Sequence, residues 1–160
     1  MTDYHASISW QRDGAKFTDN RYRRLHSWTF DEGLAVPASS SPHSVPLPYS
    51  EARAVDPEEA LVAAVSSCHM LWFLSIAAKR GFVVERYADN PVGTLGRNAK
   101  GRDMITIITL RPDITFGGEQ RPSPSDVDAM HHEAHEVCCL SNSVTAEVRY
   151  EPVNRSATAP

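Results

Sequence analysis

Residues 56–81 read DPEEALVAAVSSCHMLWFLSIAAKRG, and the organisation of the rest of the chain follows from this stretch. From Ala60 to Ala78 it contains no Asp, Glu, Lys or Arg. Asp56 suits the N-cap of a helix, the proline after it suits the first helical position, and Gly81 suits the left-handed residue that follows a helix. The stretch therefore predicts one long helix, apolar on nearly all sides, with Cys68 near its middle.

A helix of this kind is buried either in a protein core or in a membrane. The polar side chains Ser66, Ser67 and His69 are grouped at its centre, where hydrocarbon tolerates them least. The flanks carry no basic stretch that would fix an orientation, and no second hydrophobic stretch accompanies the first. The pattern favours a core helix over a transmembrane segment.

The composition is that of an ordinary globular protein, with 41% hydrophobic and 22% charged residues among 160. We expect a single domain over residues 1–152 and a frayed tail at 153–160. The net charge of −4 argues against a general nucleic-acid binder. The N-terminal sequence MTDYHASISW shows no secretory signal, so we expect a cytoplasmic location in which the cysteines are thiols.

The segment before the long helix predicts short strands. His5–Trp10 alternates apolar and polar residues, Asp13-Gly14 is a hairpin signal, and Ala15–Phe17 is expected to return as a second strand. His26–Phe30 alternates again. The Pro- and Ser-rich segment 35–55 is expected to be a loop, either a plain surface linker or a segment that walls a pocket or reaches a second subunit.

The segment after the long helix predicts more strands and a second helix. Strands are expected at 82–87 and 92–97, and the Ile- and Thr-rich stretch 104–110 is the strongest and most central strand. Ser123 suits the N-cap of the second helix, with proline just inside it. Residues 143–151 alternate as a closing strand. This order of elements predicts an α+β domain in which sheets wrap around helices.

The three cysteines, Cys68, Cys138 and Cys139, form neither a disulfide framework nor a zinc pattern. One interpretation is that they are only small buried hydrophobic residues. Cys138 continues the apolar stripe of the second helix, whereas helical geometry rotates Cys139 away from it by about 100°. Cys138 is therefore expected to be the better placed of the two neighbouring thiols.

The histidines raise two other possibilities. His131 and His135 are four residues apart on one helix, as metal ligands often are, and Cys138 could join them. The sequence does not match HExxH, however, and a solvent-facing histidine group is the simpler interpretation, so we predict no metal and no cofactor. His69 follows Cys68 directly, so their side chains diverge by about 100° on a helix, which argues against His69 as a catalytic base for this thiol.

A reactive thiol in the middle of a helix needs a nearby cation to become a thiolate. The candidate cations are Arg12 and the group formed by Arg21, Arg23 and Arg24. Such an arginine needs a carboxylate to hold it in position, and Glu58 is a candidate. Ten helical residues place Glu58 about 15 Å from Cys68 along the axis. Glu58 would have to act through a folded loop or come from a second subunit.

Three stretches resemble the OsmC/Ohr family (osmotically inducible protein C-like, organic hydroperoxide resistance). DPEEALVAAVSSCHM at 56–70 resembles the first-cysteine helix, HHEAHEVCCLSNSVTAEV at 131–148 resembles the second-cysteine signature, and WQRDG at 10–14 also fits. The resemblance covers the chain from about His5 to Glu151. It implies the α+β OsmC-like fold, an intertwined homodimer with two long central helices packed against β-sheets and active sites at the subunit interface.

The resemblance also implies an activity, that of an antioxidant thiol peroxidase which reduces organic or inorganic hydroperoxides. Cys68 would be the peroxidatic thiolate that becomes a sulfenic acid, and Cys138 would resolve it to a disulfide. A dithiol or a lipoylated protein would reduce that disulfide. Arg12 matches the arginine that stabilises the thiolate, with Arg24 as the alternative, and Glu58 matches the glutamate that orients it.

Two positions depart from the family pattern. Cys139 stands where proline or an aromatic residue is usual, so a third thiol could compete as the resolving residue. His69 stands where many members carry phenylalanine. The rival hypothesis is an OsmC-fold dimeric stress-response or ligand-binding protein with little peroxidase activity. Neither hypothesis involves nucleic acid or a membrane as a partner.

Overall fold

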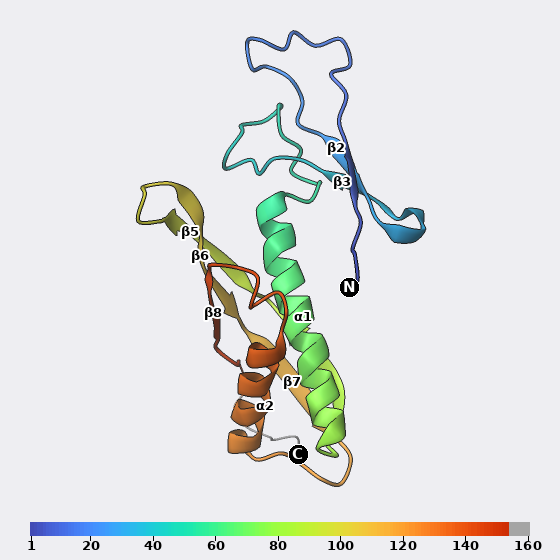
Figure 1. The fold of residues 1–160 in the computed structure, drawn as a ribbon, viewed down its shortest axis with the longest axis vertical. Helices are drawn as coiled ribbons and strands as arrows, with labels where there is room; N and C mark the ends of the chain where they lie inside the picture. The colour runs from blue at the N-terminus through green and yellow to red at the C-terminus, as the bar shows by residue number, and fades with distance from the viewer. Residues whose placement is uncertain (154–160) are drawn as a thin grey trace. The chain divides into compact units, whose positions relative to one another are not determined.

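The computed structural model describes residues Met1–Val153 and divides them into two compact units, Met1–Ala60 and a second unit that begins at Leu61 (Figure 1). The described residues contain two long α-helices and three β-sheets, so the predicted α+β class is confirmed. The assignment of residues 1–152 to a single domain stays a prediction. The expected frayed tail at 153–160 falls, beyond its first residue, outside the described residues.

The first unit contains a three-stranded antiparallel sheet of β1 (Ser7–Ser9), β2 (His26–Thr29) and β3 (Ala35–Ala38), in that order. The short 3-10 helix η1 (Asp31–Gly33) joins β2 to β3. Ser27 lies opposite Ser9 on one side and Pro37 on the other, so β2 is the central strand.

The hairpin expected around Asp13-Gly14 is wrong in one respect. A turn forms there, with both residues at positive φ, but residues 15–17 form no strand and β1 pairs with β2 instead. Phe17 stacks on Tyr22 at a centroid distance of 4.6 Å, and Trp10 contacts both rings at 5.9 and 5.3 Å. Phe17, which the expected strand at 15–17 would have placed on a sheet face, packs in this aromatic cluster instead.

The predicted loop at 35–55 is also partly wrong, because its first four residues form β3. β3 is an edge strand of its sheet, and Pro37 is tolerated there because an edge position needs no ladder hydrogen bond from its nitrogen on the open side. From Ser39 to Ala54 the chain runs without a strand or helix.

The long helix is confirmed as α1 (Pro57–Lys79). Its N-terminus is closed by a capping box, in which Glu59 N donates to Asp56 Oδ1 at 2.8 Å and Asp56 N donates to Glu59 Oε2 at 3.4 Å. Its C-terminus is followed by Gly81 at φ +80°, the left-handed conformation that glycine adopts without steric cost.

Two sheets belong to the second unit. β4 (Val83–Asp89) pairs with β7 (Pro112–Gly117), and β6 (Asp103–Leu110) lies between β5 (Val92–Arg97) and β8 (Glu147–Tyr150). The predicted strands at 82–87, 92–97, 104–110 and 143–151 are thus present, with shifted ends, and β6 is central as expected. The sequence reasoning missed β7. This strand begins at Pro112, and the first residue of a strand is a position where proline is tolerated.

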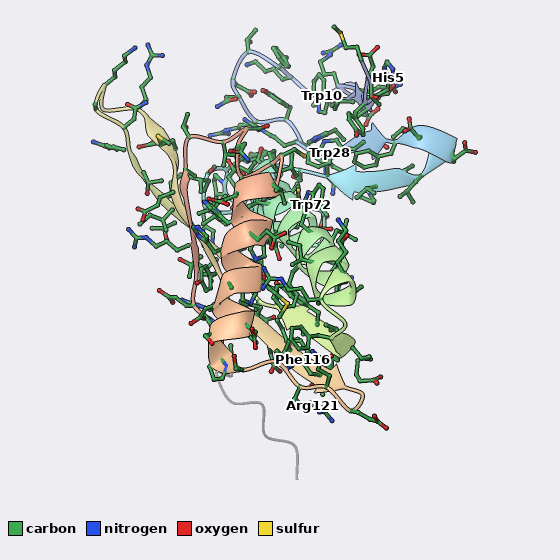
Figure 2. All side chains as sticks on the ribbon, turned by 60° about the horizontal axis from the view of Figure 1, so that its bottom comes forward. His5, Trp10, Trp28, Trp72, Phe116 and Arg121 are labelled. Carbon is green, nitrogen blue, oxygen red and sulfur yellow. The ribbon has the colours of Figure 1, made fainter. Side chains whose placement is uncertain are left out.

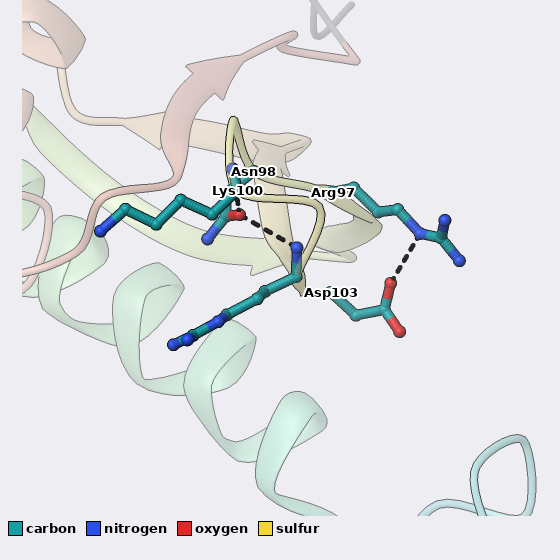
Figure 3. Close-up of polar contacts among 5 residues, drawn as sticks. Arg97, Asn98, Lys100 and Asp103 are labelled. Carbon is teal, nitrogen blue, oxygen red and sulfur yellow. Dashed lines mark hydrogen bonds and ion pairs between the residues drawn. The ribbon is translucent and has the colours of Figure 1, made fainter.

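The β5–β6 turn is held by a compact polar network (Figure 3). Asn98 Oδ1 accepts from the backbone nitrogens of Lys100 and Arg102 at 2.9 and 3.0 Å. Arg97 and Asp103 close the strand ends with an ion pair at 3.2 Å. The local positive charge of this segment therefore lies on an ordered hairpin, and the turn chemistry fixes the register of the central strand.

The second helix is α2 (Pro124–Val137). Ser123 caps it as predicted, because its Oγ accepts from Asp126 N at 3.2 Å and Asp126 Oδ2 accepts from Ser123 N at 2.8 Å. The helix ends one residue before the cysteine pair. Cys138 is the C-cap, with φ −67° and ψ 110°, so Cys138 and Cys139 leave the helical path.

Two apolar clusters hold the second unit together. α1 contributes Phe73, Ile76 and Ala77 to the first cluster, where they pack on Phe82 and on Met130 and Ala134 of α2. α1 contributes Val65 to the second, where it packs on Ile108 and Leu110 of β6. Figure 1 shows α2 beside the C-terminal half of α1, and Figure 2 shows Phe116 on β7, against the first cluster. One stripe of α1 therefore serves both clusters.

The opposite side of α1 departs from the expectation of a helix buried all round. Leu71 is 60% exposed, Trp72 (labelled in Figure 2) is 38% exposed, and Leu61 is 37% exposed. By length and composition alone, α1 is long and apolar enough to cross a membrane, and 39% of its most apolar stretch is buried. The single chain thus covers only one stripe of its most apolar helix.

Candidate active site: a cluster of three thiols

The three cysteines gather where α1 meets the end of α2. Cys68 is half-buried on α1, Cys138 is fully buried at the C-cap of α2, and Cys139 is exposed. Cys68 Sγ lies 3.9 Å from Cys139 Sγ, and Cys68 and Cys138 influence each other's pKa. Two sequence motifs 70 residues apart are therefore brought to one place, and all three thiols are free.

The position of Cys139 corrects the sequence-based expectation. That expectation assumed a continuing helix, in which successive side chains diverge by about 100°. Because the helix ends at Val137, this rule does not apply, and Cys139 approaches Cys68 from the loop. The sequence signal for Cys139 was its unusual presence beside Cys138, but its direction depended on the helix end, which is the least predictable part of a helix.

The loop that carries the two cysteines is held by polar side chains. Asn142 Nδ2 donates to the carbonyl oxygens of Glu136 and Cys138 at 2.9 and 3.0 Å. Ser143 Oγ donates to the carbonyl oxygen of Cys139 at 2.7 Å. These contacts satisfy carbonyl groups at the end of the helix and fix the backbone at the cysteines.

The two thiols that face inward differ in acidity. Burial, and after it the neighbouring Cys138, raises the pKa of Cys68 to about 11. Burial also raises the pKa of Cys138, but hydrogen bonds from Cys68 and Ser141 outweigh it, so this pKa lies below its usual value. Ser141 N donates to Cys138 Sγ at 3.4 Å. Within the second unit, the surroundings of Cys68 therefore favour its protonated form.

The histidines do not form a solvent-facing group, and that expectation is wrong for His131. His69 and His131 are both fully buried, with His69 Nε2 and His131 Nδ1 2.9 Å apart and their rings nearly parallel. His131 also packs on Phe73 and Tyr150. His132 remains exposed, paired with Glu136. Among the described residues no three His, Cys, Asp or Glu side chains are arranged to hold a metal ion.

Arg12 and Glu58 belong to the first unit. The Arg12 guanidinium donates from Nη1 to the carbonyl oxygen of Ala15 at 2.8 Å, within its own turn. Arg24, the alternative, donates to Asn20 Oδ1 at 2.6 Å and lies 4.0 Å over the Tyr22 ring. Glu58 is exposed on the first turn of α1. The three thiols thus lie together in the second unit, whereas Arg12 and Glu58, the two predicted charged site residues, belong to the first unit.

An open hollow of about 460 Å³ lies at the C-terminal end of α1. Its lining is almost entirely apolar and consists of Leu74, Ala78, Gly81, Phe82, Val83 and Val84. None of the cysteines contributes to it, so this hollow is separate from the thiol cluster.

Together these features define an α+β protein with a cysteine-based candidate site. The model of the OsmC-like protein family matches residues 50–152, and the chain belongs to that family. An OsmC-like protein of unknown function from Vibrio cholerae is 51% identical, with a TM-score of 0.93, and the match covers 96% of this chain and all of that one. No curated protein matches the sequence significantly.

More distant solved structures share the fold. An organic hydroperoxide resistance protein from Elizabethkingia anophelis is 14% identical, with a TM-score of 0.69 over 95% of this chain and 94% of that one. An organic hydroperoxide resistance protein, OsmC, from Legionella pneumophila is 16% identical, with a TM-score of 0.64 over 95% of this chain and 96% of that one. At these identities the likeness concerns the fold.

The buried histidine pair predicts a specific pH dependence of stability. Burial, and after it the charge of His135, lowers the pKa of His69 to about 4. Burial, and after it the charge of His69, lowers the pKa of His131 to about 3. In the unfolded chain both groups bind protons near pH 6.5, so the unfolded state binds more protons below that value. Stability is therefore present above pH 6.5 and falls as the pH drops towards 4.

We expect each histidine to remove about 1.4 kcal/mol of unfolding free energy per pH unit across this window. The measurement is urea unfolding between pH 7 and 4.5. The double variant His69→Gln/His131→Asn, in which an amide nitrogen on one side can donate to an amide oxygen on the other, should lose most of the slope that wild type shows. The exposed control His132→Gln should keep it. Equal slopes in all three proteins would contradict neutral buried histidines.

Proposed function

We propose that this protein is a thiol-dependent peroxidase that reduces organic hydroperoxides, with Cys68 as the attacking thiol. The observation that carries the proposal is the thiol cluster, in which the Cys68 sulfur lies 3.9 Å from that of Cys139 and the buried Cys138 directly precedes Cys139. Membership of the OsmC-like family supports it, as do fold neighbours described as organic hydroperoxide resistance proteins.

The proposed reaction needs two sulfur atoms and no metal. The Cys68 thiolate attacks the terminal oxygen of the hydroperoxide, the O–O bond breaks, and the alcohol leaves with a proton, so that Cys68 becomes a sulfenic acid. Cys138 then attacks the Cys68 sulfur, the hydroxyl group leaves as water, and a Cys68–Cys138 disulfide forms. A dithiol, or a lipoylated protein, returns both residues to thiols and is itself oxidised to a disulfide.

The attacking form must be a thiolate, and the second unit alone does not supply one, because the pKa of Cys68 is raised to about 11. A guanidinium beside the sulfur would lower this pKa. We propose Arg12 for this role, with Glu58 orienting it and Arg24 as the alternative arginine. Arg12 and Glu58 would reach the thiol from the first unit of the same chain or of a second one.

A second copy of the chain is the proposed cover for the open side of α1. Leu61, Leu71 and Trp72 expose apolar surface there. Cys68 lies seven residues after Leu61 and three before Leu71, and residues at these spacings share one side of a helix. Burying this side against a second copy would remove apolar area from water and enclose the Cys68 sulfur. We therefore propose a homodimer with α1 at its interface.

The second candidate function is a dimeric stress-response or ligand-binding protein with little peroxidase activity. The observation that favours it is the raised pKa of Cys68, which leaves this thiol protonated at neutral pH unless a cation approaches it. The apolar hollow at the end of α1 could hold a small apolar ligand in that case. Catalytic turnover separates the two candidates.

We expect the wild-type protein to consume cumene hydroperoxide in the presence of dithiothreitol or a reduced lipoylated domain. Cys68→Ser should lower the rate by at least about 1,000-fold, because the nucleophile is lost. The matched control is Ser67→Ala, a neighbouring exposed residue on the same helix. Unchanged turnover in Cys68→Ser would contradict Cys68 as the attacking thiol. No turnover in the wild-type protein with either reductant would leave the binding function in front.

We expect the wild-type protein to sediment as a dimer and Leu71→Glu to sediment as a monomer at the same concentration, because the substitution places a charge in the apolar contact. Val153→Glu is the control, since Val153 is 63% exposed and lies outside α1. Sedimentation velocity measures all three proteins. A wild-type monomer, or a Leu71→Glu variant that remains dimeric, would contradict the proposed interface.

A further inference from the structure

The chain carries one more thiol at this site than the proposed reaction uses. Cys68 and Cys138 suffice to form a disulfide, but Cys138 is fully buried. Cys139 is exposed, and its sulfur lies 3.9 Å from that of Cys68. Cys68 is therefore flanked by an interior thiol on one side and a surface thiol on the other.

We propose that Cys139 is a further catalytic residue, which moves the disulfide from the interior to the surface by thiol–disulfide exchange and is the sulfur that a protein reductant attacks. This inference rests on the proposed function, in which a Cys68–Cys138 disulfide forms first. It assigns separate tasks to the two neighbouring cysteines: Cys138 resolves the sulfenic acid, and Cys139 delivers the disulfide to the reductant.

The exchange step is balanced and needs no outside reagent. The Cys139 thiolate attacks Cys68 Sγ, a Cys68–Cys139 bond forms, the Cys68–Cys138 bond breaks, and Cys138 leaves as a thiolate. The number of disulfides stays at one. A reduced lipoyl group, a dithiol, then attacks the exposed Cys139 sulfur, releases the Cys68 thiol and forms a mixed disulfide. Its second sulfur displaces Cys139, and the lipoyl group leaves in its disulfide form.

The surroundings of Cys138 favour its role as the leaving group. A thiol of lower pKa leaves faster in thiol–disulfide exchange. The Ser141 backbone nitrogen donates to Cys138 Sγ at 3.4 Å, and this contact supports a negative charge on the departing sulfur. Cys139 has the opposite character, since it is exposed in the single chain.

The backbone around the pair holds both sulfurs within reach of Cys68. Asn142 donates to the carbonyl oxygen of Cys138 and Ser143 to that of Cys139, so the two consecutive peptide carbonyls are both held. Because the loop is held at these two points, exchange requires rotation of side chains rather than movement of the loop. The 3.9 Å separation of Cys68 and Cys139 must shorten to about 2 Å for the bond to form.

The test compares wild type with Cys139→Ser and Cys138→Ser. Each protein is oxidised with one equivalent of cumene hydroperoxide, or separately with diamide, and then mixed with a reduced lipoylated domain. Peptide mapping identifies the disulfide, and stopped-flow fluorescence follows its reduction. The control is Val137→Ser, which places a small polar side chain on an exposed neighbouring position and removes no thiol.

We expect oxidised wild type and Val137→Ser to form the Cys68–Cys138 disulfide first and then to contain the Cys68–Cys139 disulfide. Cys138→Ser lacks the resolving thiol, so it should form Cys68–Cys139 more slowly than wild type does. Oxidised Cys139→Ser should hold only Cys68–Cys138, and the lipoylated domain should reduce it at least about 10-fold more slowly, because the buried sulfur is less accessible. Oxidation of Cys68 by the peroxide should proceed at the wild-type rate in the control Val137→Ser.

Reduction of Cys139→Ser at the wild-type rate, or no Cys68–Cys139 disulfide in wild type, would overturn the role of Cys139 and leave the peroxidase standing. Failure of the peroxide to oxidise Cys68 in wild type would instead overturn the proposed function. The diamide arm still decides the exchange in that case, because diamide forms the disulfide without a peroxide step. Thermal unfolding of the variants shows whether each remains folded.

Discussion

The second unit depends on the burial of one stripe of α1. Val65, His69, Phe73 and Ile76 lie on this stripe, and they pack on β6, on α2 and on the β4–β7 pair. Replacing Phe73 by alanine would leave a cavity between both helices and cost about 3–5 kcal/mol. Because Cys68 precedes His69 by one residue, the packing of His69 fixes where Cys68 points. The buried His69 and the candidate catalytic Cys68 are thus neighbours in sequence whose side chains point in different directions.

The end of α2 is the second constraint on the site. Met130 and Ala134 dock this helix on α1, and the helix stops where Cys138 caps it. A helix longer by one turn would have carried Cys139 away from Cys68. The early stop, held by Asn142, turns a pair of sequential cysteines into two thiols with different surroundings, one buried and one exposed.

Sequence reasoning was most accurate where local chemistry decides the structure. The caps at Asp56 and Ser123 and the strong strand pattern before Leu110 were predicted because their signals are short-range. It failed where long-range packing decides. The Phe17–Tyr22 contact displaced an expected strand, and the His69–His131 pair joins two helices that no local pattern connects. The contact between Cys68 and Cys139 could not be predicted for the same reason, since only the tertiary fold brings the two cysteine motifs together.

The most direct test of the central claim is to trap the oxidised form of Cys68. In Cys138→Ser/Cys139→Ser no other thiol remains to resolve a sulfenic acid, so dimedone should capture it after one equivalent of cumene hydroperoxide. The account predicts one dimedone adduct per chain, located at Cys68 by mass spectrometry. A folded protein that consumes no peroxide and carries no adduct would contradict it.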